Sequence, residues 1–274
     1  MRNRIIFIIV GLSIISIMFG LSILKRSSKI NIIPKASSKT QSAQELIRES
    51  QDLEQKADLL GLKTVYQKLI NDFSSHKDIA VWQKKMDEVN LKIIFSPLII
   101  PAVSREYEIQ PQDNLTKIAK QFNTTVELLM KSNNLSSDRI NPGRKIKVWT
   151  AKFNVLVDKS QNTLILKLND EIMKTYAVAT GLNNSTPFGT FKIINKLANP
   201  TWYKAGAVVP SGSPENILGT RWLGFDLAGY GIHGTTEPGS IGRQSTAGCI
   251  RMLNPDVEEL YSLLSAGTEV TIVD

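Results

Sequence analysis

The sequence predicts a multidomain protein with an N-terminal transmembrane helix, a small α-helical region, a βααβ module and a mostly-β C-terminal domain with one packed helix. A long uncharged apolar run near the start indicates the transmembrane helix. Apolar residues at helical spacing continue to about residue 95, and alternating apolar residues with frequent Gly and Pro turns dominate from residue 150 onward. These changes of pattern place the domain boundaries.

The first segment is expected to anchor the chain in a membrane. Residues 5–24 carry no charge, and a helix of this length spans about 30 Å, the thickness of a bilayer's hydrocarbon core. A cleaved signal peptide would have a shorter apolar core and small residues at a cleavage site, whereas Leu24 is followed by Lys25 and Arg26. The pattern favours an uncleaved single-pass anchor over 1–26, followed by a flexible linker over 27–43.

The net charge of +8 is unevenly distributed along the chain. Residues 1–40 carry +7, residues 41–149 carry +2 and residues 150–274 carry −1. Nucleic-acid-binding domains concentrate Lys and Arg on the binding domain itself, so this distribution argues against a nucleic-acid partner. The hydrophobic content of 42% excludes a wholly disordered chain, and a single cysteine excludes a disulfide scaffold.

The region 44–96 is expected to form a helical hairpin or small bundle. Its apolar residues recur three and four positions apart, as on one face of an α-helix. They are Leu62, Val65, Tyr66, Leu69, Ile70 and Phe73 on one face, and Ile79, Trp82, Met86, Val89 and Ile93 on a second. Since no repeat of this unit follows, we interpret the region as a structured spacer.

Residues 105–149 have the pattern of a compact βααβ unit. Tyr107 to Ile109 alternates like a strand, and Asp113-Asn114 can cap a first short helix. Thr124-Thr125 can cap a second helix. A turn at 141–143 then leads into a closing strand at 145–148.

This unit resembles the LysM family of glycan-binding modules through Tyr107 to Leu115, Thr124 to Leu128, Asn133 to Leu135 and Ile140 to Ile146. The resemblance implies that 105–149 binds peptidoglycan, whose glycan contains N-acetylglucosamine, in a groove between two loops. The residues placed in that groove are Gln112, Asp113, Asn114, Leu115, Asn133, Asn134, Leu135 and Ile140. Asn133 and Asn134 are equally expected as ordinary helix terminators, since Asn tolerates the left-handed conformation.

The C-terminal domain, 152–274, is predicted to be mostly β. Strand patterns occur at 153–157, 164–168, 172–179, 190–197 and 269–273. One helix is indicated by Asn254 as its cap, Pro255 in its first turn and Gly267 as its stop.

The single cysteine, Cys249, is the first candidate for chemistry in this domain. It lies among small residues that leave its sulfur accessible, and the nearby Arg251 could lower the pKa of the thiol or bind an anion. A cysteine nucleophile needs a base. His76 lies in a charged stretch between helices, whereas His233 precedes Cys249 by sixteen positions in the same Gly-rich domain. The residues alone leave a catalytic pair and a coincidence equally open.

The whole of 152–274 also resembles a known family, the L,D-transpeptidase catalytic domain of bacterial cell-wall enzymes. The resemblance is carried by several motifs in the same order as in that family. They are Thr186 to Ile193, Leu218 to Gly224, Ile232 to Thr235, Cys249 to Met252 and Gly267 to Val273.

That resemblance implies that Cys249 is the nucleophile and His233 the general base. The backbone carbonyl of Gly234 would orient His233, and backbone N–H groups around Gly248 and Cys249 would form an oxyanion hole. Arg251 would orient the active-site loop or a substrate carboxylate, with a structural ion pair as its alternative role. No cofactor and no metal ion is expected.

One position departs from the family's pattern. The family usually has a second histidine directly before the Gly-Cys pair, and this chain has Ala247 there. Loss of one hydrogen-bond donor near an oxyanion can cost about 10²–10³ in rate, or nothing where the donor's role is structural. Ala247 therefore removes a side chain that could form a hydrogen bond near the oxyanion or the substrate.

The expected function is that of a membrane-anchored peptidoglycan L,D-transpeptidase whose catalytic domain lies on the extracytoplasmic side. Cys249 would take the acyl group of a tetrapeptide stem and pass it to an amine of a neighbouring stem, which forms a 3→3 cross-link. Carbapenems are expected to acylate the same cysteine. Two other classes stay open: a non-catalytic peptidoglycan-binding protein with a degenerate site, and an L,D-carboxypeptidase or lipoprotein-attaching transferase.

Overall fold

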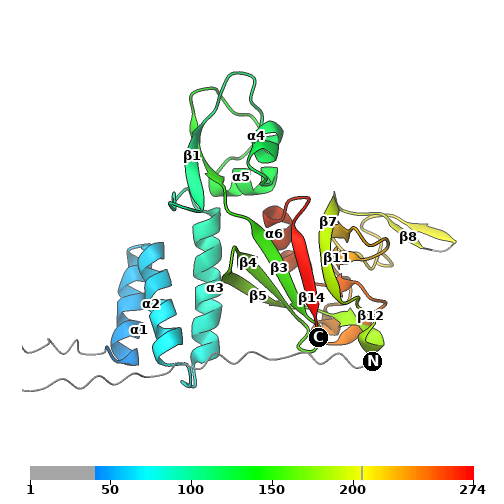
Figure 1. Ribbon diagram of the computed structural model, residues 1–274, viewed down its shortest axis with the longest axis horizontal. Coiled ribbons are helices and arrows are strands. Elements are labelled where there is room, and N and C mark those ends of the chain that lie inside the picture. The colour runs from blue at the N-terminus through cyan, green and yellow to red at the C-terminus, as the bar shows by residue number, and fades with distance from the viewer. Residues whose placement is uncertain (1–40, 205) are drawn as a thin grey trace, which may run out of the picture. The chain divides into compact units, whose positions relative to one another are not determined.

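The computed structural model describes residues 41–204 and 206–274 (Figure 1). Three hydrophobic cores organise these residues. One core lies inside a helical bundle and one inside a small two-stranded module. The largest core belongs to an eight-stranded sheet with its packed helix.

The helical region forms a bundle of three helices, α1 (Ala43–Gln55), α2 (Leu59–Asp72) and α3 (Ile79–Phe95). A capping box starts α1, because the Ser42 side chain accepts from the Glu45 N–H and the Glu45 carboxylate accepts from the Ser42 N–H. The apolar faces that the spacing predicts pack against one another. Their buried members are Leu62, Val65, Tyr66, Leu69, Trp82, Met86, Val89 and Ile93, and Leu46 of α1 is buried with them.

The βααβ pattern of the next unit is confirmed. Its elements are β1 (Ser104–Glu108), α4 (Leu115–Gln121), α5 (Val126–Ser132) and β2 (Lys145–Trp149). The two strands pair antiparallel. Asn114 and Thr125 cap the two helices through their side chains, as the sequence predicts.

The C-terminal domain is built on one eight-stranded sheet with the order β13-β11-β10-β7-β14-β3-β4-β5. Its strands are β3 (Phe153–Asp158), β4 (Thr163–Leu168), β5 (Glu171–Ala177), β7 (Gly189–Ala198), β10 (Arg221–Phe225), β11 (Gly231–His233), β13 (Ile250–Arg251) and β14 (Glu269–Val273). The helix α6 (Asn254–Leu263) buries its apolar residues in the core of this domain.

Two smaller strand pairs lie beside the main sheet. The pair β6 (Thr180–Gly181) and β12 (Gln244–Thr246) is parallel, and the hairpin β8 (Trp202–Lys204) and β9 (Ala207–Val209) is antiparallel. Short 3₁₀ turns occur at Leu182–Asn184 and Pro238–Ser240.

The sheet's core extends into the other two units. Leu91 and Ile94 of α3, Leu128 of α5 and Trp149 of β2 are buried together with the apolar residues of the sheet and α6. The helical bundle and the βααβ module are therefore packed on the C-terminal domain and share its core.

Helix α3 covers the edge strand β5 of the sheet (Figure 1). The Asn90 side chain donates to the Met173 carbonyl at 3.1 Å, and the Thr175 N–H donates to the Asp87 carboxylate at 3.2 Å. Two side chains one helical turn apart thus satisfy backbone groups that an uncovered edge strand would present to another chain.

A buried lysine joins the βααβ module to the end of α3. Lys147 of β2 is 2% exposed, and its ammonium donates to the carbonyls of Ile93 at 3.1 Å and Ser96 at 2.9 Å. The Ile93 carbonyl also accepts from the Ser96 N–H and hydroxyl, so Lys147 adds to the hydrogen bonds that close the end of α3. Burial lowers the pKa of Lys147 to about 8, because it penalises the charged form.

The predicted fold class is wrong in one component. Within 41–204 and 206–274, no helix is long and apolar enough to cross a membrane. The longest described helix, α3, has 17 residues and is amphipathic, with its apolar face used in the bundle. The predicted span at 5–24 lies outside the described residues. The fold class that the structure supports is a helical bundle, a βααβ module and a mostly-β domain with one packed helix.

We expect Asp87→Asn to stabilise the fold at neutral pH. Burial raises the pKa of Asp87 to about 6 from 3.8, so the folded state prefers the protonated form and stability falls as pH rises from about 4 through 6. An asparagine removes the buried charge and keeps an acceptor for Thr175. Thermal unfolding should show a gain of about 1–2 kcal/mol at pH 7.5 that disappears near pH 4. A loss of stability at pH 7.5 would contradict the prediction.

Candidate active site

Parallel pairing of two short strands brings the predicted chemical groups together. In β11 and β13, His233 lies opposite Arg251 and Ile232 lies opposite Ile250. Partners across a sheet point to the same face, and Cys249 lies two positions before Arg251, where strand alternation points its side chain to that face as well. His233 and Cys249 line one cavity of about 440 Å³.

A backbone hydrogen bond fixes the orientation and tautomer of His233. The ring Nδ1 lies 2.7 Å from the Gly234 carbonyl oxygen. Because a carbonyl oxygen can only accept, Nδ1 carries the proton, and Nε2 is left as the ring atom that can accept one. The ring also stacks on Trp222 with centroids 6.0 Å apart. The expected role of Gly234 as the orienting carbonyl agrees with this geometry.

Burial keeps His233 neutral at physiological pH. The side chain is 2% exposed, and this burial lowers its pKa to about 4, with a smaller lowering from the Arg251 charge. The bond to Gly234 acts in the opposite direction. The imidazole is therefore available as a proton acceptor at neutral pH.

The thiol of Cys249 is partly buried and protonated in the resting protein. Its sulfur lies 3.4 Å from the Gly229 carbonyl oxygen. Burial raises the pKa of Cys249 above its ordinary value of 9.0, although a backbone hydrogen bond from Gly231 and the Arg251 charge both lower it. Arg251 thus acts in the direction that the sequence predicts, but burial has the larger effect.

The turn that carries Cys249 is held by a threonine and a glycine. The Thr246 hydroxyl donates to the Cys249 carbonyl at 2.6 Å and accepts from the Gly248 N–H at 3.1 Å. Gly248 has φ +134°, and a Cβ there would lie 2.7 Å from the Tyr230 ring. The Gly248 N–H is thus already bonded, which leaves the Cys249 N–H as the other donor that the family resemblance places at an oxyanion hole.

Arg251 forms the ion pair that was its alternative role. Its guanidinium contacts the Glu237 carboxylate at 2.9 Å and the Ser240 hydroxyl at 3.0 Å, and its side chain is 8% exposed. Arg251 also lines the cavity, and its buried Nε has no hydrogen-bond partner among the described residues. Arg251 therefore ties the 237–240 turn to β13 beside the cavity.

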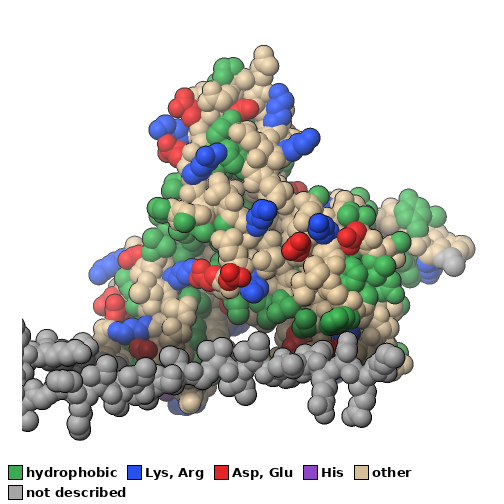
Figure 2. Space-filling model, in the orientation of Figure 1, with side chains coloured by type: hydrophobic (Ala, Val, Ile, Leu, Met, Phe, Trp, Pro, Cys, Tyr) green, Lys and Arg blue, Asp and Glu red, His purple; other side chains and the backbone are tan. Residues whose placement is uncertain are grey.

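The aromatic walls of the cavity are residues that sequence reasoning did not assign to the site. Trp222 comes from β10, and Trp202 and Tyr203 come from β8. In the space-filling view, hydrophobic side chains are exposed on the β8–β9 hairpin (Figure 2). Tyr203 of β8 is 75% exposed. Adjacent aromatic residues in a Gly- and Pro-rich stretch are the sequence signal that could have found them.

Asn254 does not have the capping role that the sequence predicts. It is the first residue of α6, and its side chain accepts from the N–H groups of Thr220 at 3.2 Å and Thr235 at 3.0 Å. Its amide group donates to the Thr235 carbonyl at 2.9 Å. Asn254 therefore ties α6 to the segment that directly follows His233 and Gly234.

The predicted glycan-groove residues are largely occupied with local structure. Asp113 accepts from the Gln110 N–H and the Tyr107 hydroxyl, and Asn114 caps α4. The Asn133 amide bonds the backbone of Lys147 on both sides. Asn134 adopts φ +50°, as expected of a helix terminator, and Leu115 is buried. Leu135 and Ile140 pack on the module's core, whereas Gln112 is exposed.

A partly buried thiol and a neutral, oriented imidazole in one cavity define a class of proteins, those with a cysteine–histidine nucleophilic site. Comparison with known proteins makes this class specific. The model of the L,D-transpeptidase catalytic domain (YkuD) matches residues 152–272, and the LysM domain model matches residues 107–149.

Two relatives from Bacillus subtilis carry names of L,D-transpeptidases. YkuD is 36% identical over 173 residues, which are 61% of this chain and 97% of that protein. YqjB is 41% identical over 126 residues, which are 44% of this chain and 70% of that protein. A solved structure of an L,D-transpeptidase from Mycobacterium smegmatis aligns with 48% of this chain and 64% of its own, at 20% identity and a TM-score of 0.39. The chain belongs to the L,D-transpeptidase family.

We expect the reactivity of Cys249 to rise steadily with pH. Alkylation by iodoacetamide needs the thiolate, and the raised pKa of the thiol beside a neutral imidazole means that little thiolate exists at pH 7. The rate should rise about tenfold per pH unit between pH 6 and 9. Because the chain has one cysteine, total labelling reports this site, and Cys249→Ala is the blank. A flat rate between pH 5 and 8 would indicate a thiolate–imidazolium pair instead.

Proposed function

We propose that this L,D-transpeptidase cross-links peptidoglycan through an acyl-enzyme on Cys249, with His233 as the general base. The observation that carries the proposal is the 2.7 Å contact between His233 Nδ1 and the Gly234 carbonyl. That contact makes Nε2 the proton acceptor in a cavity that also holds the thiol. The base is thus prepared before a substrate arrives.

The first half of the proposed reaction forms the acyl-enzyme. His233 Nε2 takes the proton of the Cys249 thiol as sulfur attacks the carbonyl carbon of the third residue of a tetrapeptide stem. The resulting oxyanion accepts a hydrogen bond from the Cys249 N–H. When the tetrahedral intermediate collapses, the amide bond to the terminal D-alanine breaks, and His233 returns the proton to the leaving amine. A thioester remains on Cys249.

The second half transfers the acyl group. An amine of a neighbouring stem attacks the thioester carbonyl and gives a proton to His233. The carbon–sulfur bond then breaks, and the proton passes to sulfur, which restores the thiol. The product is an amide between two stems, a 3→3 cross-link. With its pKa lowered to about 4, the His233 imidazole is neutral at the start of both halves and can accept the proton.

The βααβ module supports the same function from outside the cavity. As a LysM domain it is proposed to hold the glycan strand, which raises the local concentration of stems near Cys249. Peptidoglycan lies outside the cytoplasm, so we place the catalytic domain on the extracytoplasmic side. Association with the cell membrane stays a prediction from residues 1–40, whose structure is not described.

The Ala247 departure does not leave the site disordered. Ala247 is exposed and lines the cavity, and the turn beside it is held by the bonds of Thr246 to Gly248 and Cys249. An intact turn and an oriented base favour catalysis over a degenerate, non-catalytic site.

We expect a carbapenem to acylate Cys249. Intact-mass spectrometry after incubation with imipenem should show one adduct per chain, and Cys249→Ala should show none. His233→Ala should slow adduct formation by about 10²–10⁴, because the base is lost. The matched control is His76→Ala, since His76 lies in the helical bundle between α2 and α3. Absence of an adduct on the folded wild-type chain would favour the non-catalytic alternative.

We expect purified disaccharide-tetrapeptide to be converted to 3→3 dimers with release of D-alanine. Chromatography and mass spectrometry of the products identify the acceptor, and Cys249→Ala should yield neither dimer nor D-alanine. Tripeptide alone would identify water as the acceptor, as in an L,D-carboxypeptidase. Dimers that appear only when a lysine-terminated lipopeptide is supplied would favour lipoprotein attachment.

A further inference from the structure

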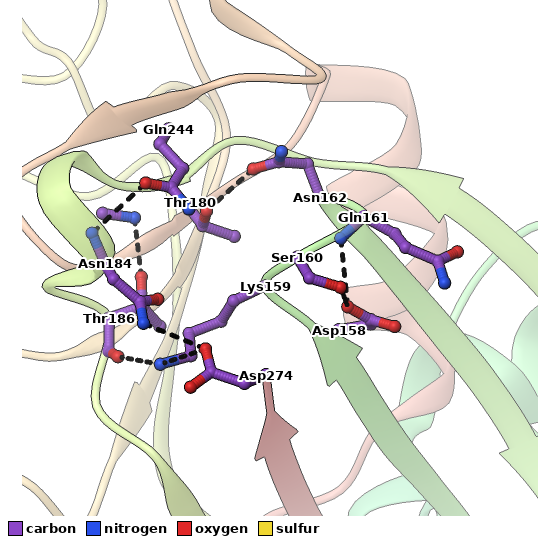
Figure 3. Close-up of polar contacts among 11 residues, drawn as sticks. Asp158, Lys159, Ser160, Gln161, Asn162, Thr180, Asn184, Thr186, Gln244 and Asp274 are labelled. Atoms are coloured by element: carbon purple, nitrogen blue, oxygen red, sulfur yellow. Dashed lines mark hydrogen bonds and ion pairs between the residues drawn. The ribbon is translucent and has the colours of Figure 1, made fainter.

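A network of polar side chains joins several segments of the C-terminal domain, and the proposed mechanism does not use it (Figure 3). We call it the Lys159 network. It consists of Lys159, Asn184, Thr186, Gln244 and Asp274. These residues come from the β3–β4 turn, the 182–186 loop, β12 and the end of β14.

A buried ammonium group is the centre of the Lys159 network. The side chain of Lys159 is 4% exposed. Its Nζ donates to the Thr186 carbonyl at 3.2 Å and lies 3.1 Å from the Asp274 carboxylate (Figure 3). An ammonium group is costly to bury unless it is paired. The Lys159 ammonium therefore holds the Thr186 carbonyl and the Asp274 carboxylate beside it.

The other members tie the 182–186 loop on both sides. The Asn184 N–H donates to the Gln244 side chain at 3.2 Å, and the Asn184 amide donates to Asp274 at 3.0 Å (Figure 3). At the base of the loop, the N–H of Gly181 in β6 donates to the Thr186 hydroxyl at 2.7 Å. The loop is thus fixed to β12 and to the end of β14 at once.

The 182–186 loop packs against the turn that carries Gly248 and Cys249. Strand β6 directly precedes the loop and pairs parallel with β12, where Gly181 lies opposite Thr246. Thr246 in turn bonds Gly248 and Cys249. The Ser185 carbonyl oxygen lies 3.3 Å from where a Cβ on Gly248 would be, so the loop backbone packs closely against that glycine. A shift of the loop would therefore shift the turn.

We propose that Lys159 is a positioning residue for the Gly248–Cys249 turn. Through Thr186 it holds the 182–186 loop, and through that loop it sets the place of the Cys249 N–H that stabilises the oxyanion. The proposal rests on the proposed acyl-enzyme function. It predicts that loss of the ammonium group impairs acylation more than it impairs simple alkylation of the thiol, because alkylation forms no oxyanion.

The test compares these two reactions in the full chain. In Lys159→Met, the first-order rate of acylation by saturating imipenem should fall about 10- to 100-fold, the range expected of a small misplacement at a reacting centre. The rate of alkylation by iodoacetamide should stay within about twofold, because alkylation needs the thiolate but forms no oxyanion. Lys192→Met, which removes an exposed lysine of β7, controls for the loss of one positive charge.

Gln244→Ala provides a second variant with little risk to folding, because Gln244 is exposed and contributes one bond to the loop. It should lower acylation in the same selective way, by a smaller factor. Equal losses of acylation and alkylation in both variants, or wild-type acylation in both, would overturn the positioning role. Failure of the wild-type chain to form any adduct would instead overturn the proposed function and this role with it.

Discussion

The site depends on the parallel pairing of β11 with β13. It sets His233 opposite Arg251, which brings the histidine to the face of the sheet beside Cys249 although the two residues are sixteen positions apart. Both strands are short, so the register needs support from outside. The Asn254 side chain accepts from the Thr235 N–H just after β11, and the Thr246 hydroxyl donates to the Cys249 carbonyl just before β13. The positions of His233 and Cys249 therefore depend on these loop contacts.

Burial sets the protonation of the site. It raises the pKa of Cys249 and lowers the pKa of His233, and both shifts favour the uncharged pair. A resting thiol is a weaker nucleophile than a thiolate, but it avoids a reactive anion in a cavity without substrate. Proton transfer to His233 then coincides with attack on the carbonyl, and the oriented Nε2 makes that transfer possible without rearrangement. The same cost of buried charge explains why the ammonium groups of Lys147 and Lys159 donate hydrogen bonds to backbone carbonyls.

Much of the fold could be predicted from the sequence because its signals are local. The helical faces of 44–96 follow from residues three and four positions apart, and the capping of α4 and α5 by Asn114 and Thr125 follows from the next turn of each helix. The cysteine and the histidine were found because each is scarce in the chain and because several ordered motifs carry the family resemblance. The transmembrane helix, in contrast, was predicted from residues 5–24, and no such helix occurs in the described part of the chain.

The sequence by itself determined the periodic elements, the boundaries of the βααβ module and the two groups that can carry acyl transfer. Only the tertiary structure decided how the polar side chains are used. Asn254 was expected to cap its own helix but bonds backbone 19 and 34 positions away. Asn133 was expected either in a glycan groove or as a helix terminator, and its side chain also completes the backbone bonds of β2. The Gly248 N–H was expected to bind an oxyanion but is taken by Thr246. In each case a local pattern shows that a group can form a hydrogen bond, whereas its partner and its burial are set by segments that meet only in the folded chain.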